Sequence, residues 1–231
     1  MICDDMLIYC GSIDIGFWPD RILGKGQQTI AALTVLILGL AALLLVRRWS
    51  LKRPTFTHLS VEKFLIFRDP TSSAAQLCTR MSTRANHSGL TQIWFRNISS
   101  DGPIDNVLVD GRQPSKIRRV AGSLEVCKDF GRSLHRGDVV QTELCYDLHN
   151  SFPGKREGIT HVTGTDTTKL AIHVRFHPNR PPESFRAFVG YGSSTEQPLA
   201  MPLEFDQNSH EIILDIRRPR VGAYYTIQWD W

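Results

Sequence analysis

The chain has 231 residues, of which 42% are hydrophobic and 22% are charged, and its formal net charge is +4. From Pro54 onward, 21 Lys and Arg residues stand against 19 Asp and Glu residues. This balance is unlike the clustered basic face of a nucleic-acid-binding protein, so we expect no nucleic-acid partner.

The first predicted element is an apolar helix at residues 26–46, a stretch without charge. Twenty-one helical residues span about 31 Å, which matches a hydrocarbon core of about 30 Å. A cleaved signal peptide is the alternative, but its apolar region is usually about 7–15 residues long. We therefore predict a short extracytoplasmic segment at 1–25, a transmembrane helix at 26–46 and a basic juxtamembrane segment at 47–53.

Basic residues on the two flanks of this segment predict its orientation. Four of them follow it, namely Arg47, Arg48, Lys52 and Arg53. Only Arg21 and Lys25 precede it. Because basic flanks stay on the cytoplasmic side, we expect a single-pass protein of the plasma (inner) membrane with its N-terminus outside. The segment has no pair of small residues one turn apart, so any oligomerisation is expected through the domain that follows.

Residues 54–231 read as a β-rich cytosolic domain. Nine short segments are rich in β-branched and aromatic residues and are bounded by turn residues, at 60–67, 90–98, 105–109, 139–146, 169–176, 185–189, 199–205, 211–216 and 224–229. Such a series without intervening helices predicts an antiparallel β-sandwich or a barrel-like domain. Two smaller halves are the alternative, with a boundary near 148–166. Residues 69–89 and 150–168 are predicted to be long polar loops.

The cysteines and histidines do not predict a metal site. The cysteine spacings contain no C-x-x-C pair, and free thiols in a reducing compartment are the simplest interpretation. A disulfide between two of Cys78, Cys127 and Cys145 is the alternative, and it would require an oxidising compartment. Four histidines fall close together in the sequence, at His149, His161, His173 and His177. The last two would lie about 13 Å apart on one strand, which is too far for one metal ion.

No catalytic motif or cofactor-binding motif is present, so we expect neither an enzyme nor a cofactor. The sequence has no Gly-rich phosphate loop after a strand, no G-x-S-x-G and no H-E-x-x-H. Arginine-rich positions could contact an anion, and the candidates are Arg118, Arg119, Arg217, Arg218 and Arg220. Arginines that simply coat a sheet and its turns are the alternative interpretation.

The C-terminus is the most distinctive segment. Tyr225, Trp229 and Trp231 share one face of the last predicted strand, which favours a structural role in the core. An aromatic ligand platform is the alternative. The run from Lys169 to Trp231 resembles a β-sandwich module of uncharacterised bacterial proteins, some of them linked to antiviral conflict systems.

The overall plan is also similar to the membrane-anchored β-rich effectors of cyclic-oligonucleotide antiphage defence, although those carry two membrane spans. The sequence thus predicts a non-catalytic, membrane-anchored sensor or interaction protein whose cytosolic β-sandwich binds a protein or a small ligand. One alternative is an antiphage-type effector that recognises a phosphorylated or nucleotide ligand and perturbs the membrane. Another is a hydrolase with an unrecognised site.

Overall fold

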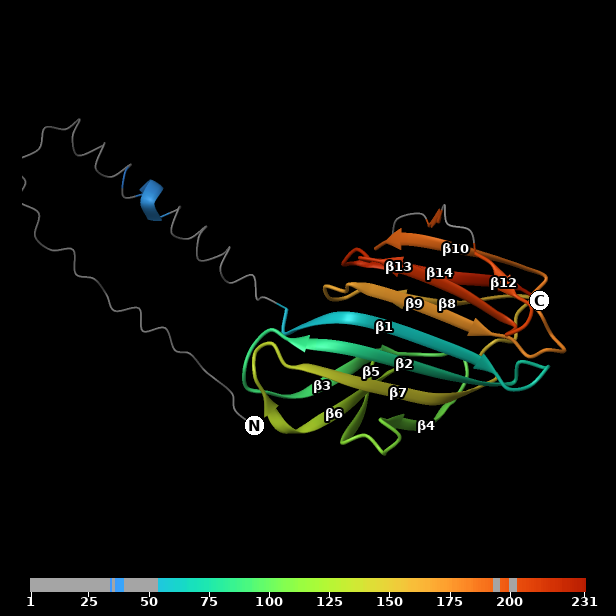
Figure 1. The fold of residues 1–231 in the computed structure, drawn as a ribbon, viewed down its shortest axis with the longest axis horizontal. Coiled ribbons are helices and arrows are strands. Elements are labelled where there is room, and N and C mark those ends of the chain that lie inside the picture. Colours follow the sequence, from blue (N-terminus) through green and yellow to red (C-terminus); the bar gives the residue numbers. More distant parts are fainter. Residues whose placement is uncertain (1–33, 35, 40–53, 193–195, 200–202) are drawn as a thin grey trace, which may run out of the picture. The chain divides into compact units, whose positions relative to one another are not determined.

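A computed structural model of the chain describes residues 34, 36–39, 54–192, 196–199 and 203–231 (Figure 1). The chain divides into two compact units, Met1–Lys52 and Arg53–Trp231. Nearly all described residues belong to the second unit, which is built from strands.

The structure corrects the predicted fold class at the N-terminus. Within the described residues, no helix is long and apolar enough to cross a membrane. Helix is described only at Thr34 and at residues 36–39, which is about one turn. The prediction of an N-terminal transmembrane helix is therefore not supported, and the described fold is mainly β. The rest of 26–46 lies outside the described residues, as do Arg47, Arg48, Lys52 and Arg53.

The larger layer of the second unit is a seven-stranded sheet in the order β12-β13-β9-β1-β2-β7-β4. Its strands are β1 (Phe56–Phe67), β2 (Ala74–Ala85), β4 (Ile104–Val109), β7 (Val139–His149), β9 (Lys169–Arg175), β12 (Phe205–Asp206) and β13 (Glu211–Arg217). Neighbouring strands are antiparallel except β1 and β9, which are parallel. The β1–β9 pairing places segments from both sides of 148–166 in one sheet.

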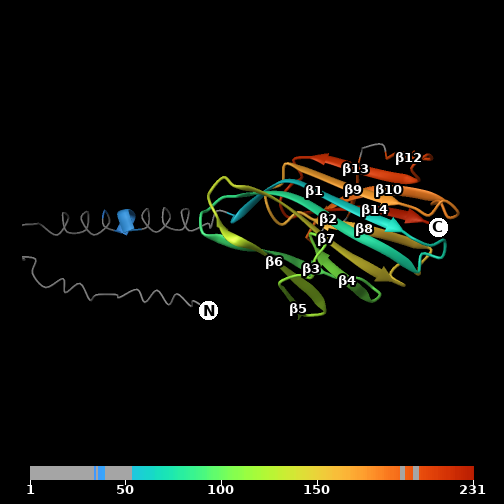
Figure 2. The same cartoon turned by 60° about the horizontal axis from the view of Figure 1, so that its bottom comes forward.

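Two smaller sheets supply the second layer (Figures 1 and 2). One has the order β11-β10-β14-β8, with strands Gln197–Pro198, Ser184–Tyr191, Ala223–Asp230 and Arg156–Val162. The other has the order β3-β6-β5, with strands Leu90–Ile98, Ser123–Leu134 and Lys116–Val120. One hydrophobic core joins all three sheets, because buried residues of each belong to a single packed cluster.

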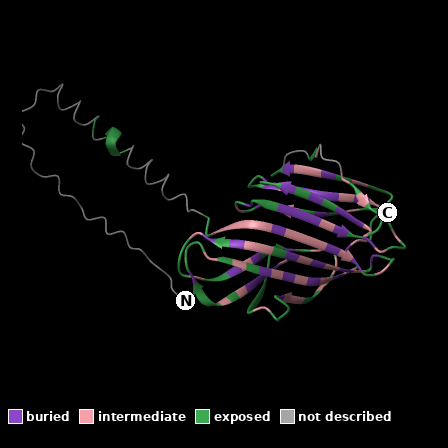
Figure 3. Ribbon diagram, in the orientation of Figure 1, coloured by how far each residue is buried: buried purple, intermediate pink, exposed green. Residues whose placement is uncertain are grey.

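Alternation along the strands explains the two layers. In β9, Leu170, Ile172 and Val174 are fully buried while Lys169 and Arg175 are exposed, as a strand with one face on a core requires. Figure 3 shows the same banding of buried and exposed residues on the neighbouring strands. The prediction of a β-sandwich from this alternation agrees with the described architecture.

Several strands were not predicted. The expected loops at 69–89 and 150–168 contain β2 and β8. The core-facing side of β2 includes Thr79 and Thr83, and β8 carries Gly158 among charged residues. In β2 the two threonines interrupt the inward series of Ala75, Leu77 and Met81, and in β8 Ile159 is the only aliphatic residue at an inward position. Neither strand therefore shows the sustained apolar alternation that marks a strand in sequence. The expected strand at 199–205 is instead two short pieces, β11 and β12, with residues 200–202 outside the described ones.

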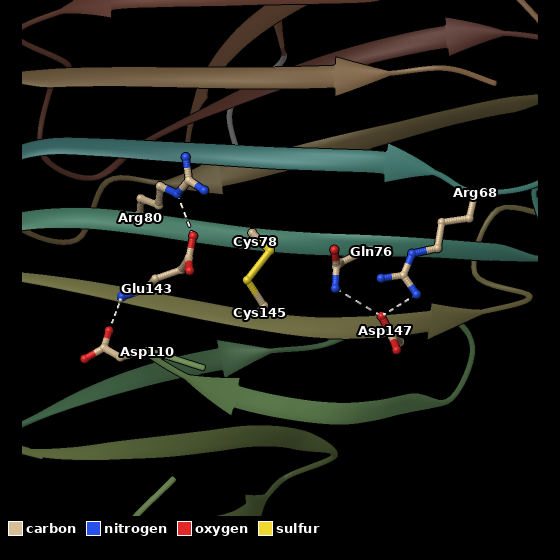
Figure 4. Close-up of a disulfide and its surroundings, with 8 residues drawn as sticks. All are labelled: Arg68, Gln76, Cys78, Arg80, Asp110, Glu143, Cys145 and Asp147. Atoms are coloured by element: carbon tan, nitrogen blue, oxygen red, sulfur yellow. Dashed lines mark hydrogen bonds and ion pairs between the residues drawn. A yellow bond between two sulfur atoms is a disulfide. The ribbon is translucent and has the colours of Figure 1, made fainter. Parts of the chain in front are cut away.

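A disulfide joins Cys78 of β2 to Cys145 of β7 (Figure 4). The two residues are direct cross-strand partners, and their Cα atoms are 4.1 Å apart. Their side chains lie on the outer face of the seven-stranded sheet, beside the ion pair between Arg80 and Glu143. This pairing corrects the expectation that these cysteines are free thiols, while Cys127 is a buried free cysteine.

Candidate ligand-binding cleft

The second layer of the sandwich is divided, and a cleft lies at the division. The cleft has a volume of about 1430 Å³ and is lined by β3 on one side and β8 on the other, with β1, β2 and β7 forming its floor. We call it the β3–β8 cleft. Typical small-ligand pockets occupy about 300–1,000 Å³, so this cleft could hold a large or elongated ligand.

Most of the floor and part of both walls are apolar. Val61, Leu65 and Leu77 come from the seven-stranded sheet, Phe95 from β3 and Ile159 from β8. All five are buried in the hydrophobic core. The hydrophobic surface that a ligand can reach comes from half-buried residues of the lining, among them Phe56, Met81 and Phe152, and it favours burial of an apolar group.

A lysine interrupts this apolar surface. Lys63 occupies the position between Val61 and Leu65 that faces the cleft, and its ammonium group donates a hydrogen bond to the backbone carbonyl of Thr160, at 3.1 Å. Burial lowers the pKa of Lys63 to about 8, since a low-dielectric environment disfavours the charged form. At neutral pH the lysine is still mostly protonated, so the floor carries a positive charge.

Lys63 has no carboxylate partner among the described residues. The lysines of the described strands that form ion pairs are Lys128, with Asp110, and Lys169, with Asp215. Lys63 is half-buried, and an ammonium group that has lost part of its hydration is stabilised by pairing or hydrogen bonding. One carbonyl contact leaves two donors of the Lys63 ammonium for a ligand.

Two histidines stand near Lys63 in the cleft. Burial and the positive charge of Lys63, with His58 as a lesser influence, lower the pKa of His161 to about 3. Burial likewise lowers the pKa of His58, whose Nδ1 lies 2.9 Å from the Thr83 hydroxyl. Both imidazoles are therefore neutral at pH 7, and each can offer a hydrogen bond without adding charge. A single anionic group placed on Lys63 would neutralise the floor.

None of the arginines suggested by sequence lines this cleft. Arg118 and Arg119 lie on β5, where Arg118 binds Glu125 at 2.5 Å and stacks over Trp94 at 4.4 Å. Arg217 ends β13 and is followed by Arg218 and Arg220 in the turn before β14, where Arg220 contacts the Tyr191 hydroxyl at 3.3 Å. The structure thus separates the five arginines into a pair on β5 and a group of three at the end of β13 and in the turn that follows it.

The four histidines that are close in sequence do not share a binding partner, and His161 is the one that lines the cleft. His149 lies 3.6 Å from Asp105, His173 lies 3.3 Å from Glu211, and His177 accepts a hydrogen bond from the backbone of Asn179. Within the described residues, a group of metal-ligand type is found at Cys78, Glu143 and Cys145. Its two sulfur atoms are joined in the disulfide.

The C-terminal aromatic residues pack in the hydrophobic core. Tyr225 and Trp229 are buried in the core, at 4% and 1% exposure, and Trp231 packs partly buried against them. Trp229 and Trp231 surround Phe67 and Phe176, with ring centroids 5.2–5.8 Å apart.

Sequence reasoning missed Lys63 and His58, and it considered His161 only as a candidate metal ligand. The predicted strand at 60–67 already contained the relevant signal, because Lys63 shares the inward register of Val61, Leu65 and Phe67. A charged residue in the buried register of a strand is a candidate for a functional role. His161 could not be placed in the same way, since β8 was expected to be a loop.

Comparisons with known proteins give a likeness of fold alone. No family model matches the chain, and no curated protein matches it. An M1 zinc metallopeptidase from Deinococcus radiodurans is 12% identical with a TM-score of 0.43, covering 76% of this chain and 42% of its own. Yeast LTA4 hydrolase is 9% identical with a TM-score of 0.45, and the match covers 75% of this chain and 29% of the hydrolase. A protein from Legionella pneumophila that is described as nutrient-binding is 11% identical with a TM-score of 0.46, and the match covers 76% of this chain and 67% of that protein.

The present chain therefore spans less than half the length of the two hydrolases. At these TM-scores none of the three likenesses bears on function. None concerns the bacterial conflict-system proteins that the C-terminal segment resembles, so that resemblance stays a prediction.

Proposed function

We propose that the β-rich unit is a non-catalytic binding module whose β3–β8 cleft takes a ligand through an anionic group on Lys63. The observation that carries this proposal is a protonated lysine in an apolar cleft with a backbone carbonyl as its hydrogen-bond partner. Charge-assisted hydrogen bonds to a carboxylate or phosphate are stronger than a contact to a neutral carbonyl. Binding of an anion would thus supply the counter-ion that the described protein lacks.

The shape of the site suggests an amphipathic ligand. Half-buried apolar residues such as Phe56, Met81 and Phe152 line the same cleft as Lys63, so a ligand that contacts the ammonium can also cover hydrophobic surface. We expect an anionic group with an attached apolar or extended body. This expectation concerns residues 54–231 alone.

The other two functions considered from sequence have less support. An effector that grips a phosphorylated ligand through arginines would need those arginines to converge, and they do not line the cleft. A hydrolase that works through a covalent intermediate needs an accessible nucleophile next to a base. The pairing of Thr83 with His58 has the required residue types, but Thr83 is 0% exposed.

Calorimetric titration of the full-length chain with octanoate tests the proposal, with octanol as the uncharged control. We expect octanoate to bind and octanol to bind at least about tenfold more weakly, because a hydrogen bond to a charged group contributes about 1.5–3 kcal/mol. Lys63→Met should weaken octanoate binding by a similar factor. Lys116→Met is the matched control, since Lys116 is exposed on β5. Equal octanoate affinity in the wild type and Lys63→Met would overturn the proposal.

A further inference from the structure

The two walls of the β3–β8 cleft are sheet edges. In the part of the chain that the structure describes, β8 pairs with β14 alone and β3 pairs with β6 alone. Each strand therefore turns an unpaired edge toward the cleft that both strands line. Unpaired strand edges present backbone N–H and C=O groups that can accept another strand.

The hydrogen-bond alternation of β8 identifies the groups that face the cleft. Trp231 donates its backbone N–H to the carbonyl of Lys155 at 2.9 Å, and Thr163 donates to Ala223 at 2.8 Å. In an antiparallel pair every second residue bonds its partner, so the odd-numbered residues between these two bonds face β14. The even-numbered residues Gly158, Thr160 and Val162 therefore direct their backbone N–H and C=O groups away from β14 and toward the cleft.

The contact of Lys63 supports this assignment independently. Its ammonium group comes from β1 and reaches the carbonyl of Thr160, which is one of the even-numbered residues. Inward-pointing charges are one of the ways in which sheets block their edges. Apart from this contact, no charged side chain of Gly158 or Val162 blocks the edge of β8. Gly158 has no side chain, and Val162 is a hydrophobic residue whose exposed fraction is 64%.

We propose that the β3–β8 cleft binds an extended acidic segment of a partner protein, which adds as a strand along the free edge of β8. A carboxylate of the segment accepts a hydrogen bond from the Lys63 ammonium group and pairs with its charge. This inference rests on the proposed function, and it names the class of ligand: a peptide and not a free amphipathic anion. Charge complementarity is local to Lys63 on the floor, since Glu157 of β8 and Asp101 also line the cleft. The volume of about 1430 Å³ accommodates an extended chain.

Strand periodicity specifies the sequence of the segment. Side chains alternate across a strand, so every second residue of the added segment would face the floor. Paired residues of neighbouring strands point their side chains to the same face, and on β8 the inward side chains are those of Glu157, Ile159 and His161. The residue beside His161 therefore faces the floor next to the Thr160 carbonyl, meets Lys63 and should be acidic. Its neighbours two positions away also face the floor and should be apolar. The expected pattern is apolar-x-acidic-x-apolar, over a length close to that of β8, which has seven residues.

The test uses the full-length chain and the peptide acetyl-Thr-Val-Thr-Glu-Thr-Val-Thr-amide, followed by calorimetry. Two peptide controls have Gln for the central Glu, or N-methyl groups on the backbone amides that would face β8. Thr160→Pro removes an N–H that faces the cleft, and proline is tolerated on an edge strand. Thr160→Val is its matched control, since it loses the hydroxyl bonded to Thr226 but keeps the N–H.

We expect the parent peptide to bind, and each peptide control to bind at least about tenfold more weakly. Thr160→Pro should bind the parent peptide at least about tenfold more weakly than Thr160→Val does, because both variants lose the hydroxyl and only the proline variant loses the N–H. Binding should also slow amide hydrogen exchange at Gly158, Thr160 and Val162 of the wild type. This measurement does not depend on the folding of any variant.

Strand addition is overturned if the parent peptide does not bind, if the N-methylated peptide binds equally well, or if exchange at these amides is unchanged. In any of these cases, octanoate binding that still depends on Lys63 would leave the anion site standing. Loss of the Lys63 dependence with octanoate would remove the proposed function itself. The two failures are therefore distinguishable.

Discussion

The ammonium group of Lys63 and the carbonyl of Thr160, 97 residues apart in the chain, are joined by a hydrogen bond of 3.1 Å. The bond connects the floor of the cleft in β1 to the free edge of β8. It therefore links the large sheet to the four-stranded sheet at the point where we propose that ligand binds.

Lys63 should make stability depend on alkaline pH. Its pKa is about 8 in the folded protein and about 10.5 when unfolded, so between these values the unfolded chain binds more protons. Stability should therefore rise as the pH increases from 8 to 10, by about 1–3 kcal/mol. Urea unfolding of the wild type and Lys63→Met over this range measures the effect. The variant should lack the rise, and parallel curves for the two proteins would contradict the low pKa.

His161 should contribute to acid sensitivity. Its pKa is about 3 in the folded state, against 6.5 as the ordinary value, so the unfolded chain takes up a proton as the pH falls below 6.5. Stability should decrease by about 2–3 kcal/mol between pH 7 and pH 4 because of this residue. The groups facing it that can carry a positive charge are Lys63 and, once protonated at lower pH, His58. His161→Gln should have a flatter stability profile in this window, and an unaltered profile would show that His161 titrates normally.

The disulfide between Cys78 and Cys145 should stabilise the fold. It closes a loop with a sequence separation of 67, and the chain-entropy model gives about 4 kcal/mol for such a loop. Replacing both cysteines by Ala should lower the melting temperature, and adding a reductant should do the same to the wild type only. Equal melting of the wild type with and without reductant would mean that the bond contributes nothing.

The same cysteines test where the domain resides. The cytoplasmic location expected from sequence stays a prediction, whereas disulfides persist mainly in oxidising compartments. Alkylation of the native protein in lysates, followed by mass spectrometry, distinguishes the two cases. Protection of Cys78 and Cys145 would place the domain in an oxidising compartment, and full alkylation would favour the cytoplasm.

The C-terminal strand should be required for folding. Trp229 is 1% exposed and packs against Phe67, Phe152 and Phe176. Replacing Trp229 by Ala should cost about 3–5 kcal/mol, and truncating the chain after Gly222 should abolish the cooperative melt, because domains have only about 5–15 kcal/mol of stability. A truncated chain that melts cooperatively near the wild-type temperature would show that the strand is peripheral.

Much of the fold was predictable because apolar alternation reports burial directly. The segment at 169–176 alternates in the sequence, and Leu170, Ile172 and Val174 are buried in β9. β2 was not predictable in the same way, because Thr79 and Thr83 occupy core-facing positions that usually hold apolar residues.

The site was less predictable than the fold. Its walls, β3 and β8, are separated by more than 50 residues in the chain. Their proximity depends on how the two small sheets pack side by side on the seven-stranded sheet. The pairing of Cys78 with Cys145 depends likewise on β2, which sequence patterns did not reveal. Of the cleft groups, Lys63 alone was visible as a charge within a buried register.

The pKa of Lys63, followed by NMR of the side-chain Cε resonance with and without saturating octanoate, tests the central claim most directly. We expect a value of about 8 in the free protein and a clear rise toward the ordinary value of lysine when octanoate is bound, because an adjacent anion favours the charged form. An ordinary lysine pKa in the free protein, or a pKa that octanoate leaves unchanged, would contradict the account.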